Sequence, residues 1–379
     1  MDSLTQIALG AAVGEAVAGR RAGNKAVLWG AVAGTIPDLD ILLNPFLDQV
    51  DQLAMHRGIS HSFAFAVFAA PVFGWLVSRV HRRSEASFRD WTLVGFFGFL
   101  THTLLDYLTI YGTQLFRPFS DYPAALGTLF IIDPLYTVPL ALGVLGAMVF
   151  SRSDSRRRVW NQVGLTLSSL YIVFSIGAKF HAVEVFKAEL ARQNIQYERL
   201  FVAPMPLNTI LWMALADDPA RDQVQVGLYS FLDDQKAGPI EFRALPKYSQ
   251  LIAGAETTRA IQRLLWFSRG YYTVEESPDG RLAFSDLRFG RSDGWMGAKG
   301  EYIFVFDLEE STPGSRNFVN FERRTPGFDV NQERLSGLVE RVRGKRDAGA
   351  AAASEKSARS ADCTDAPRLA CAGSRTDSP

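Results

Sequence analysis

Four long apolar segments dominate the first half of the chain and constrain what it can fold into. They are Ser62–Val80, Trp91–Tyr111, Phe130–Phe150 and Trp160–Ala178, and they carry very few charged residues. A helix of about 20 apolar residues is long enough to cross the hydrocarbon core of a bilayer. The segments therefore predict transmembrane helices, with buried helices of a large soluble core as the alternative reading.

Two earlier segments, Leu4–Gly19 and Asn24–Ile36, are apolar but weaker candidates. As a helix the second covers only ~20 Å of a core that is ~30 Å thick, so we expect it to end inside the membrane at Pro37. Their small residues favour close packing against the longer spans. The sequence thus predicts an α-helical membrane bundle of about six helices, some of them short.

Charge is distributed unevenly, although the 40 basic and 40 acidic residues cancel. A neutral chain offers no general attraction for nucleic acid, and none is expected as a partner. Basic residues gather in three connections between the apolar segments: Arg20 to Lys25, Arg79 to Arg89, and Arg152 to Arg158. By the positive-inside rule these connections are cytoplasmic. We therefore expect a multi-pass protein of a bacterial inner membrane, with its C-terminal domain on the outer side.

Histidines and aspartates interrupt the apolar sequence, in Pro37–Asp40, His56–His61 and Thr101–Asp106. Buried ionisable groups are costly, and metal coordination commonly offsets that cost. Counted at ~1.5 Å per residue from the basic connections, six ionisable residues lie ~18 to ~28 Å along their helices. They are Asp2, Asp38, His61, His102, Asp106 and Asp133, and we expect them in one layer near the outer face. Mixed imidazole and carboxylate groups suit zinc, manganese or iron, and magnesium beside a second metal is also open.

Seven residues are candidate metal ligands: Asp2, Asp38, His56, His61, His102, Asp106 and Asp133. His102 and Asp106 are four residues apart and so share one helix face. Two of the seven have structural alternatives, because Asp2 can cap a helix and Asp133 can hydrogen-bond a neighbouring helix. We expect Glu15 to pair with a nearby arginine, while His81 and His181 fall outside the site.

Five blocks in order resemble a known family: Met1–Gln6, Gly34–Asp40, His56–Ser62, Thr101–Asp106 and Tyr111–Phe116. They are similar to the membrane-bound metal-dependent hydrolases of bacterial inner membranes, the YdjM-like group, over roughly residues 1–180. That group is related in pattern to zinc-dependent phospholipase C, which implies phosphoester hydrolysis. Many members carry histidine where this chain has Gln6. Either one metal position is weakened here, or Gln6 orients a ligand or binds substrate.

The resemblance implies attack by water that a divalent metal activates, with zinc the metal expected first and manganese or magnesium open. Asp40 is a ligand or a general base. Arg57 and Arg117 can each hold a phosphate by two hydrogen bonds, although Arg117 can equally meet lipid head groups. A site in the outer half of the bilayer suggests a phospholipid or an isoprenoid phosphate as substrate. The alternative is a non-enzymatic membrane protein that binds or transports metal ions.

The rest of the chain changes character after residue 180. Short alternating runs predict a small α+β domain at residues 181–343, with an antiparallel sheet and a helix around Ser249–Ser268. It has no histidine after His181, so we expect it to cover the membrane site or bind a partner. Residues 344–379 are poor in large apolar side chains and should be disordered. Cys363 and Cys371 lie in that tail and constrain the fold little.

Overall fold

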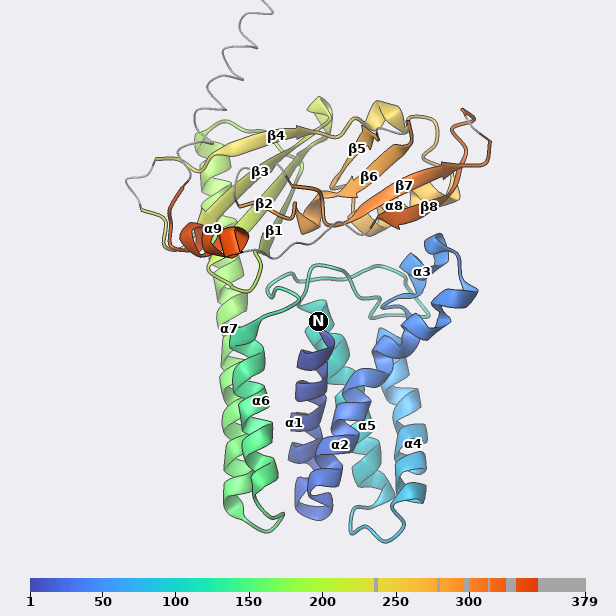
Figure 1. Cartoon of the computed structure of the whole chain (residues 1–379), viewed down its shortest axis with the longest axis vertical. Helices are drawn as coiled ribbons and strands as arrows, with labels where there is room; N and C mark the ends of the chain where they lie inside the picture. The colour runs from blue at the N-terminus through green and yellow to red at the C-terminus, as the bar shows by residue number, and fades with distance from the viewer. Residues whose placement is uncertain (235–237, 278–279, 296–299, 313, 325–331, 347–379) are drawn as a thin grey trace, which may run out of the picture.

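The computed structural model describes residues 1–234, 238–277, 280–295, 300–312, 314–324 and 332–346. A helical bundle forms one end of the molecule, and a domain of two antiparallel sheets lies on the other (Figure 1). This arrangement confirms the predicted fold class. The two cysteines and nearly all of the expected tail lie outside the described residues.

Six long helices form the bundle: α1 (Ser3–Ala22), α2 (Asn24–Thr35), α4 (Phe63–Val80), α5 (Phe88–Tyr107), α6 (Pro134–Val149) and α7 (Ser155–Arg192). By length and composition, three helical stretches of the described chain could cross a membrane: Asn24–Phe46, Phe63–Val80 and Ser155–Arg192. The apolar helix α6 is shorter. It begins at Pro134, later than expected, because Asp133 caps it by accepting a hydrogen bond from the Leu135 backbone N–H.

The α-helix α2 does end at Thr35, close to where Pro37 predicted, but the helical path does not stop there. Helix α2 continues directly into a 3-10 helix, η1 (Ile36–Phe46), and the two together span 23 residues. Proline fits the first turn of a helix because its missing N–H is not needed there, so Pro37 marks a change of helix type. As a result Asp38 and Asp40 lie on η1, at the end of the bundle that faces the sheet domain.

Helices α1 and α2 pack backbone to backbone, as their small residues predicted. A Cβ atom added at Gly10 would lie 2.3 Å from the carbonyl oxygen of Gly30. Farther along α1, Glu15 and Arg157 of α7 form a buried pair joined by two hydrogen bonds of 2.7 and 2.5 Å. The prediction that Glu15 pairs with an arginine is therefore confirmed.

Two four-stranded antiparallel sheets build the second domain, each with its strands in chain order. The first contains β1 (Arg199–Pro204), β2 (Leu211–Asp218), β3 (Gln223–Ser230) and β4 (Phe242–Pro246), and the second contains β5 (Tyr272–Glu276), β6 (Leu282–Asp286), β7 (Val305–Glu310) and β8 (Phe318–Arg324). Helices α8 (Arg259–Ser268) and α9 (Gln332–Val342) complete it, with 3-10 turns at Pro219–Arg221, Ser249–Leu251 and Leu287–Phe289. The sequence predicted one sheet, from the runs Gln223–Phe231, Ile240–Ala244, Gly270–Glu275, Arg281–Phe289 and Glu301–Asp307. It missed β1, β2 and β8. Every residue of β2 is buried, so this strand lacks the polar alternation that identifies a half-exposed strand.

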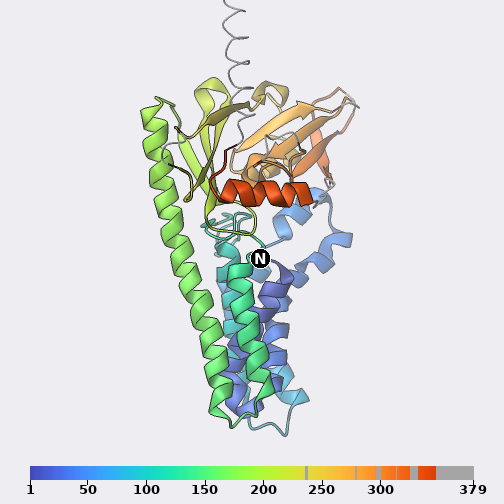
Figure 2. The same ribbon diagram turned by 60° about the vertical axis from the view of Figure 1, so that its left-hand side comes forward.

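The sheet domain is joined to the bundle on two sides. Helix α7 continues past the bundle and flanks the first sheet, as Figure 2 shows. Across the molecule, the short helix α3 (Gln49–Met55) packs its Val50 and Leu53 into the core formed by α8 and the second sheet. Arg259 of α8 pairs there with Asp48 at 2.5 Å and with Asp51 at 2.6 Å. The sheet domain is thereby held over the end of the bundle where η1 lies.

Candidate metal centre

Four side chains converge at the end of the bundle under the sheet domain. Asp38 comes from η1, His61 from the 3-10 turn η2 (Ile59–His61), and His102 and Asp106 from successive turns of α5. Each offers one ligand atom, and these atoms lie within 4.8 Å of one another. The side chains of His61, His102 and Asp106 are fully buried, whereas that of Asp38 is 23% exposed. The group is therefore open on the Asp38 side.

The spacing of the four atoms fits a single tetrahedral ion. His61 Nε2 lies 3.0 Å from His102 Nε2, 3.3 Å from Asp38 Oδ1 and 3.4 Å from Asp106 Oδ2. His102 Nε2 lies 3.5 Å from the same Asp38 oxygen and 3.7 Å from the same Asp106 oxygen. At metal–ligand distances of about 2.0–2.2 Å, neighbouring corners of a tetrahedron are about 3.3–3.6 Å apart. The five separations given are close to these values, and the two carboxylate oxygens lie within 4.8 Å of each other.

The hydrogen bonds around the two imidazoles direct their lone pairs into the cluster. His102 Nδ1 lies 2.7 Å from the carbonyl oxygen of Gly34 and must donate to it, which leaves Nε2 of the neutral ring as an acceptor. Ser60 Oγ donates to Asp40 Oδ2 at 3.1 Å and lies 3.0 Å from His61 Nδ1. The proton of His61 therefore belongs on Nδ1, and its Nε2 is also an acceptor.

Asp106 completes this set of acceptors. Its Oδ2 is buried and makes no hydrogen bond of good geometry among the described residues, although the Arg57 guanidinium forms an ion pair with it. Two imidazole nitrogens and two carboxylate oxygens thus face one point without a donor between them. Buried acceptors need such a partner, and a divalent cation supplies one for all four. The residues present therefore fit a metal ion, and the donor set suits zinc or manganese.

Gln6 lies directly behind this cluster. Its Nε2 donates to Asp106 Oδ1 at 2.9 Å and to the carbonyl oxygen of His102 at 3.3 Å, and the amino group of Met1 also contacts that Asp106 oxygen. Such outer contacts fix the orientation of ligands. The structure therefore places Gln6 where it orients Asp106, while its own Oε1 is buried without a hydrogen-bond partner among the residues that the structure describes.

Asp40 and His56 form a second layer beside the four side chains. Asp40 Oδ1 lies 3.0 Å from His56 Nδ1, and Asp40 Oδ2 accepts the backbone N–H of Arg57 at 3.0 Å and lies 3.6 Å from His61 Nδ1. The His56 side chain is 29% exposed, and its ring centre lies 6.1 Å from that of His61. These two residues link the buried centre to a more accessible edge.

Arg57 brings a positive charge to the ligands. Its side chain is buried, its Nε lies 3.0 Å from Asp106 Oδ2, and its Nη1 donates to Thr109 Oγ1 at 2.9 Å. Its guanidinium carbon lies 4.9 Å from the centre of the Tyr111 ring. The backbone of Arg57 has φ 58°, a conformation that is uncommon for a residue with a side chain. The turn between α3 and η2 thus bends sharply to place this side chain inward.

The other predicted site residues lie outside the cluster. Asp2 caps α1 by accepting the Thr5 N–H at 3.0 Å, and Asp133 caps α6 and accepts the Tyr171 hydroxyl at 2.9 Å. Arg117 is half-buried, and its Nε donates to Gln114 Oε1 at 2.8 Å. Of the seven candidate ligands, the structure brings together Asp38, His61, His102 and Asp106. Sequence reasoning missed Ser60, although it lies within the block that contains both His56 and His61.

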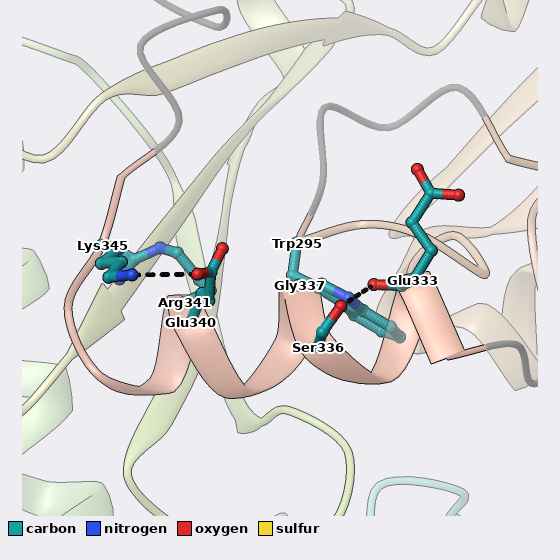
Figure 3. Close-up of a pocket in the computed structure, with 7 residues that line it drawn as sticks. All are labelled: Trp295, Glu333, Ser336, Gly337, Glu340, Arg341 and Lys345. Atoms are coloured by element: carbon teal, nitrogen blue, oxygen red, sulfur yellow. Dashed lines mark hydrogen bonds and ion pairs between the residues drawn. The ribbon is translucent and has the colours of Figure 1, made fainter.

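A separate hollow of about 160 Å³ lies on the sheet domain (Figure 3). It is lined by Trp295, Glu333, Ser336, Gly337, Glu340, Arg341 and Lys345, mostly from α9. None of these residues belongs to the metal cluster, so the chemistry of the bundle is not located here.

The half of the chain that contains this cluster is similar to a known protein family. Residues 1–182 match the YdjM inner membrane protein family. This part of the chain is similar to that family, and the match does not extend to the sheet domain. All four clustered side chains fall within the matched segment, and the match supports a membrane protein. It names no activity, so the relation to zinc-dependent phospholipase C stays a prediction.

Two further comparisons define how far similarity extends. The uncharacterized protein YfhP of Bacillus subtilis is 27% identical over 186 residues, which is 46% of this chain and 51% of that protein. The chain therefore spans about half the length of this curated relative. No solved structure matches the chain.

Proposed function

We propose that the chain is an integral membrane hydrolase that cleaves phosphoesters with a divalent cation, zinc first, held by Asp38, His61, His102 and Asp106. The observation that carries the proposal is the set of four converging acceptor atoms with no donor between them among the described residues, at the end of the bundle under the sheet domain. Bound there, such a cation lowers the pKa of water and polarises a phosphoryl oxygen.

The residues around the cluster have roles that suit this reaction. The exposed side of Asp38 is where a substrate phosphate can approach. Asp40 can accept a proton from water and pass it toward His56, which is hydrogen-bonded to it and reaches the accessible edge. Arg57 holds a fixed positive charge beside the ligands, where negative charge develops on a phosphate in the transition state.

An apolar surface surrounds the open side of the cluster and favours a lipid-linked substrate. Exposed apolar side chains on η1 and η2 flank Asp38: Leu39, Ile41, Leu42, Leu43, Phe46 and Ile59. A phosphate carried by a phospholipid or an isoprenoid could reach Asp38 along this surface without leaving the membrane. This surface supports a membrane lipid as the substrate class.

Contacts at the opposite end of the bundle support one orientation in the membrane. Arg152 donates to the carbonyl oxygen of Arg21 at 2.9 Å and pairs with Glu85 at 2.6 Å, so the three basic connections meet at one end. By the positive-inside rule we propose that this end is cytoplasmic. The metal cluster and the sheet domain then lie toward the outer face.

A phosphate-release assay on detergent-purified protein tests the proposal. It uses phosphatidic acid as the lipid probe and p-nitrophenyl phosphate as the soluble probe, with and without added zinc. The His102→Ala variant should lose activity on both probes, whereas His181→Ala, which changes an exposed histidine outside the cluster, should keep it. Cleavage of the soluble probe alone would remove the lipid part of the proposal. Metal-ion flux into liposomes without hydrolysis of either probe would replace the enzyme by an ion transporter.

A further inference from the structure

A second group of charged side chains lies where the sheet domain meets the bundle. Its basic members are Lys179, Arg199, Arg269 and Arg288. Arg269 follows α8 in a left-handed conformation, with φ 54°, and its carbonyl oxygen accepts Arg199 Nη1 at 2.8 Å. Its guanidinium carbon lies 5.6 Å from the centre of the Tyr122 ring. The side chain therefore points from the sheet domain toward the loop that joins α5 to α6.

That same loop brings Lys179 and Arg288 together. Lys179 Nζ donates to the carbonyl oxygens of Leu126 and Gly127, the latter at 3.3 Å, and Arg288 Nη1 donates to the carbonyl oxygen of Ile110 at 3.4 Å. A Cβ added at Gly127 would lie 3.3 Å from Lys179 Nζ and 3.4 Å from Ile110 Cγ2. Residues 110 and 127 are thus in contact, and the two cations bind carbonyl oxygens of the same loop.

Carboxylates neutralise only part of this charge. Arg288 forms a buried pair with Asp286, with hydrogen bonds of 3.0 and 2.6 Å, and Arg199 pairs with Asp217. In the part of the chain that the structure describes, neither Arg269 nor Lys179 lies within ion-pair distance of a carboxylate. Burial and the nearby charge of Arg288 also lower the pKa of Arg269. Two positive charges at the junction therefore lack an acidic partner.

The hydrogen-bond donors of Arg269 are incomplete as well. Its Nε and Nη2 atoms are buried and make no hydrogen bond to any described residue. Buried donors without a partner are rare in folded proteins, and an unpaired buried charge is costlier still. These two nitrogens form one edge of the guanidinium, which is the edge that binds a phosphate or carboxylate through two parallel hydrogen bonds.

We infer that the junction is an anion site that binds a phosphate group, with Arg269 donating from Nε and Nη2 and with Lys179 and Arg288 supplying further positive charge. It shares no side chain with the metal cluster, although the two are neighbours: Arg288 reaches Ile110, and Arg57 lies beside the next residue, Tyr111. The site does not depend on the proposed hydrolysis. The phosphate can belong to a lipid head group at the membrane surface or to a small soluble molecule, because the recognising chemistry is the same.

Thermal unfolding and titration calorimetry of the full chain in detergent test this inference. Both are done in the His102→Ala background without added metal, so that neither depends on the metal centre. The probes are inorganic phosphate and short-chain dihexanoyl phosphatidylglycerol. Each probe that binds should raise Tm, because a ligand that binds only the folded state stabilises it. Binding of both indicates a site for free phosphate, and binding of the lipid alone indicates a head-group site.

Variants of Arg269 identify the site. We expect Arg269→Gln to bind at least about tenfold more weakly, Arg269→Lys to be intermediate, and Arg343→Gln, an exposed control in the same domain, to be unchanged. Without any probe, Arg269→Gln should keep or raise Tm, because it removes an unpaired buried charge. A fall in its Tm would show that Arg269 is structural instead. Equal affinities of Arg269→Gln and the parent, or no binding of either probe to the parent, would overturn the inference.

Discussion

The Nε2 atoms of His61 and His102, both on fully buried side chains, face each other at 3.0 Å. Each ring has its other nitrogen engaged as a donor, His102 to Gly34 and His61 to Ser60. Two lone pairs at this distance repel unless a proton or a cation lies between them. The two flanking carboxylate oxygens make a cation the partner that satisfies all four atoms.

Removing metal should weaken the fold. A ligand that binds only the folded state stabilises it by about 2.7 kcal/mol at a concentration 100 times its Kd. We expect a strong chelator to lower the Tm of the detergent-purified chain, and added zinc to restore it. The His181→Ala variant should respond in the same way as the wild type. A Tm that is the same with chelator and with zinc would contradict a bound ion.

Replacing Gln6 should weaken metal binding without unfolding the chain. Gln6 Nε2 holds Asp106 Oδ1 at 2.9 Å, and loss of such a supporting contact typically costs about 10–100-fold in metal affinity. We expect this loss for Gln6→Ala in a competition titration with a chromophoric chelator. Gln250→Ala, an exposed glutamine of the sheet domain, is the control and should bind metal normally. Equal affinity in the two variants would show that Gln6 does not orient Asp106.

The contact between α1 and α2 should not tolerate a side chain at Gly30. A Cβ there would lie 2.2 Å from the carbonyl oxygen of Gly10, so Gly30→Ala must separate the helices, at a cost of about 1–3 kcal/mol for overpacking. Gly177→Ala in α7 is the matched control, because its Cβ meets nothing within 4 Å and alanine favours a helix. Thermal unfolding should show a lower Tm for the first variant only. A normal Tm for Gly30→Ala would mean that the helices pack less closely.

The Glu15–Arg157 pair should matter far more than an exposed one. Glu15→Gln leaves the buried guanidinium of Arg157 without its counter-charge, which typically costs about 3–5 kcal/mol. Glu85→Gln removes the exposed partner of Arg152 and should cost less than about 1 kcal/mol. Unfolding of the two variants in a denaturing detergent provides the comparison. Similar losses would show that the Glu15 pair is open to water.

Acid should loosen the contact between α3 and α8. The hydrogen bond from Arg259 lowers the pKa of Asp48, so this contact is complete above the unfolded value of about 4. It is lost as pH falls through the lowered pKa of the folded state. We correct the rate of backbone amide hydrogen exchange in α3 for its intrinsic pH dependence. The corrected rate should be constant from neutral pH to about pH 5 and should rise below that range. Arg259→Gln should show the faster exchange at neutral pH already.

The sequence was sufficient for much of the bundle and for the cluster. Apolar length located the helices, and the spacing of His102 and Asp106 placed both on one helix face. The sequence did not predict where an α-helix continues as a 3-10 helix. Pro37 was expected to end a helix, but its ring fits the first turn of η1, so α2 continues as a 3-10 helix.

Choosing among the candidate ligands needed three dimensions. Asp2 and Asp133 were predicted at the same depth as the other candidates, yet each caps its own helix, because an aspartate just before a helix satisfies free N–H groups locally. His56 shares a block with His61, but its Nδ1 is engaged by Asp40. Depth along a helix axis fixes one coordinate only, and the lateral positions come from packing between helices.

Metal content is the most direct test of the central claim. Purified wild-type chain, exposed to zinc and then desalted, should retain about one ion per chain in elemental analysis, the number that one four-ligand site holds. The His61→Ala/His102→Ala double variant should retain none, while His181→Ala should match the wild type. A wild-type chain without stoichiometric metal, or a double variant that binds as much, would contradict the account of the cluster as a metal centre.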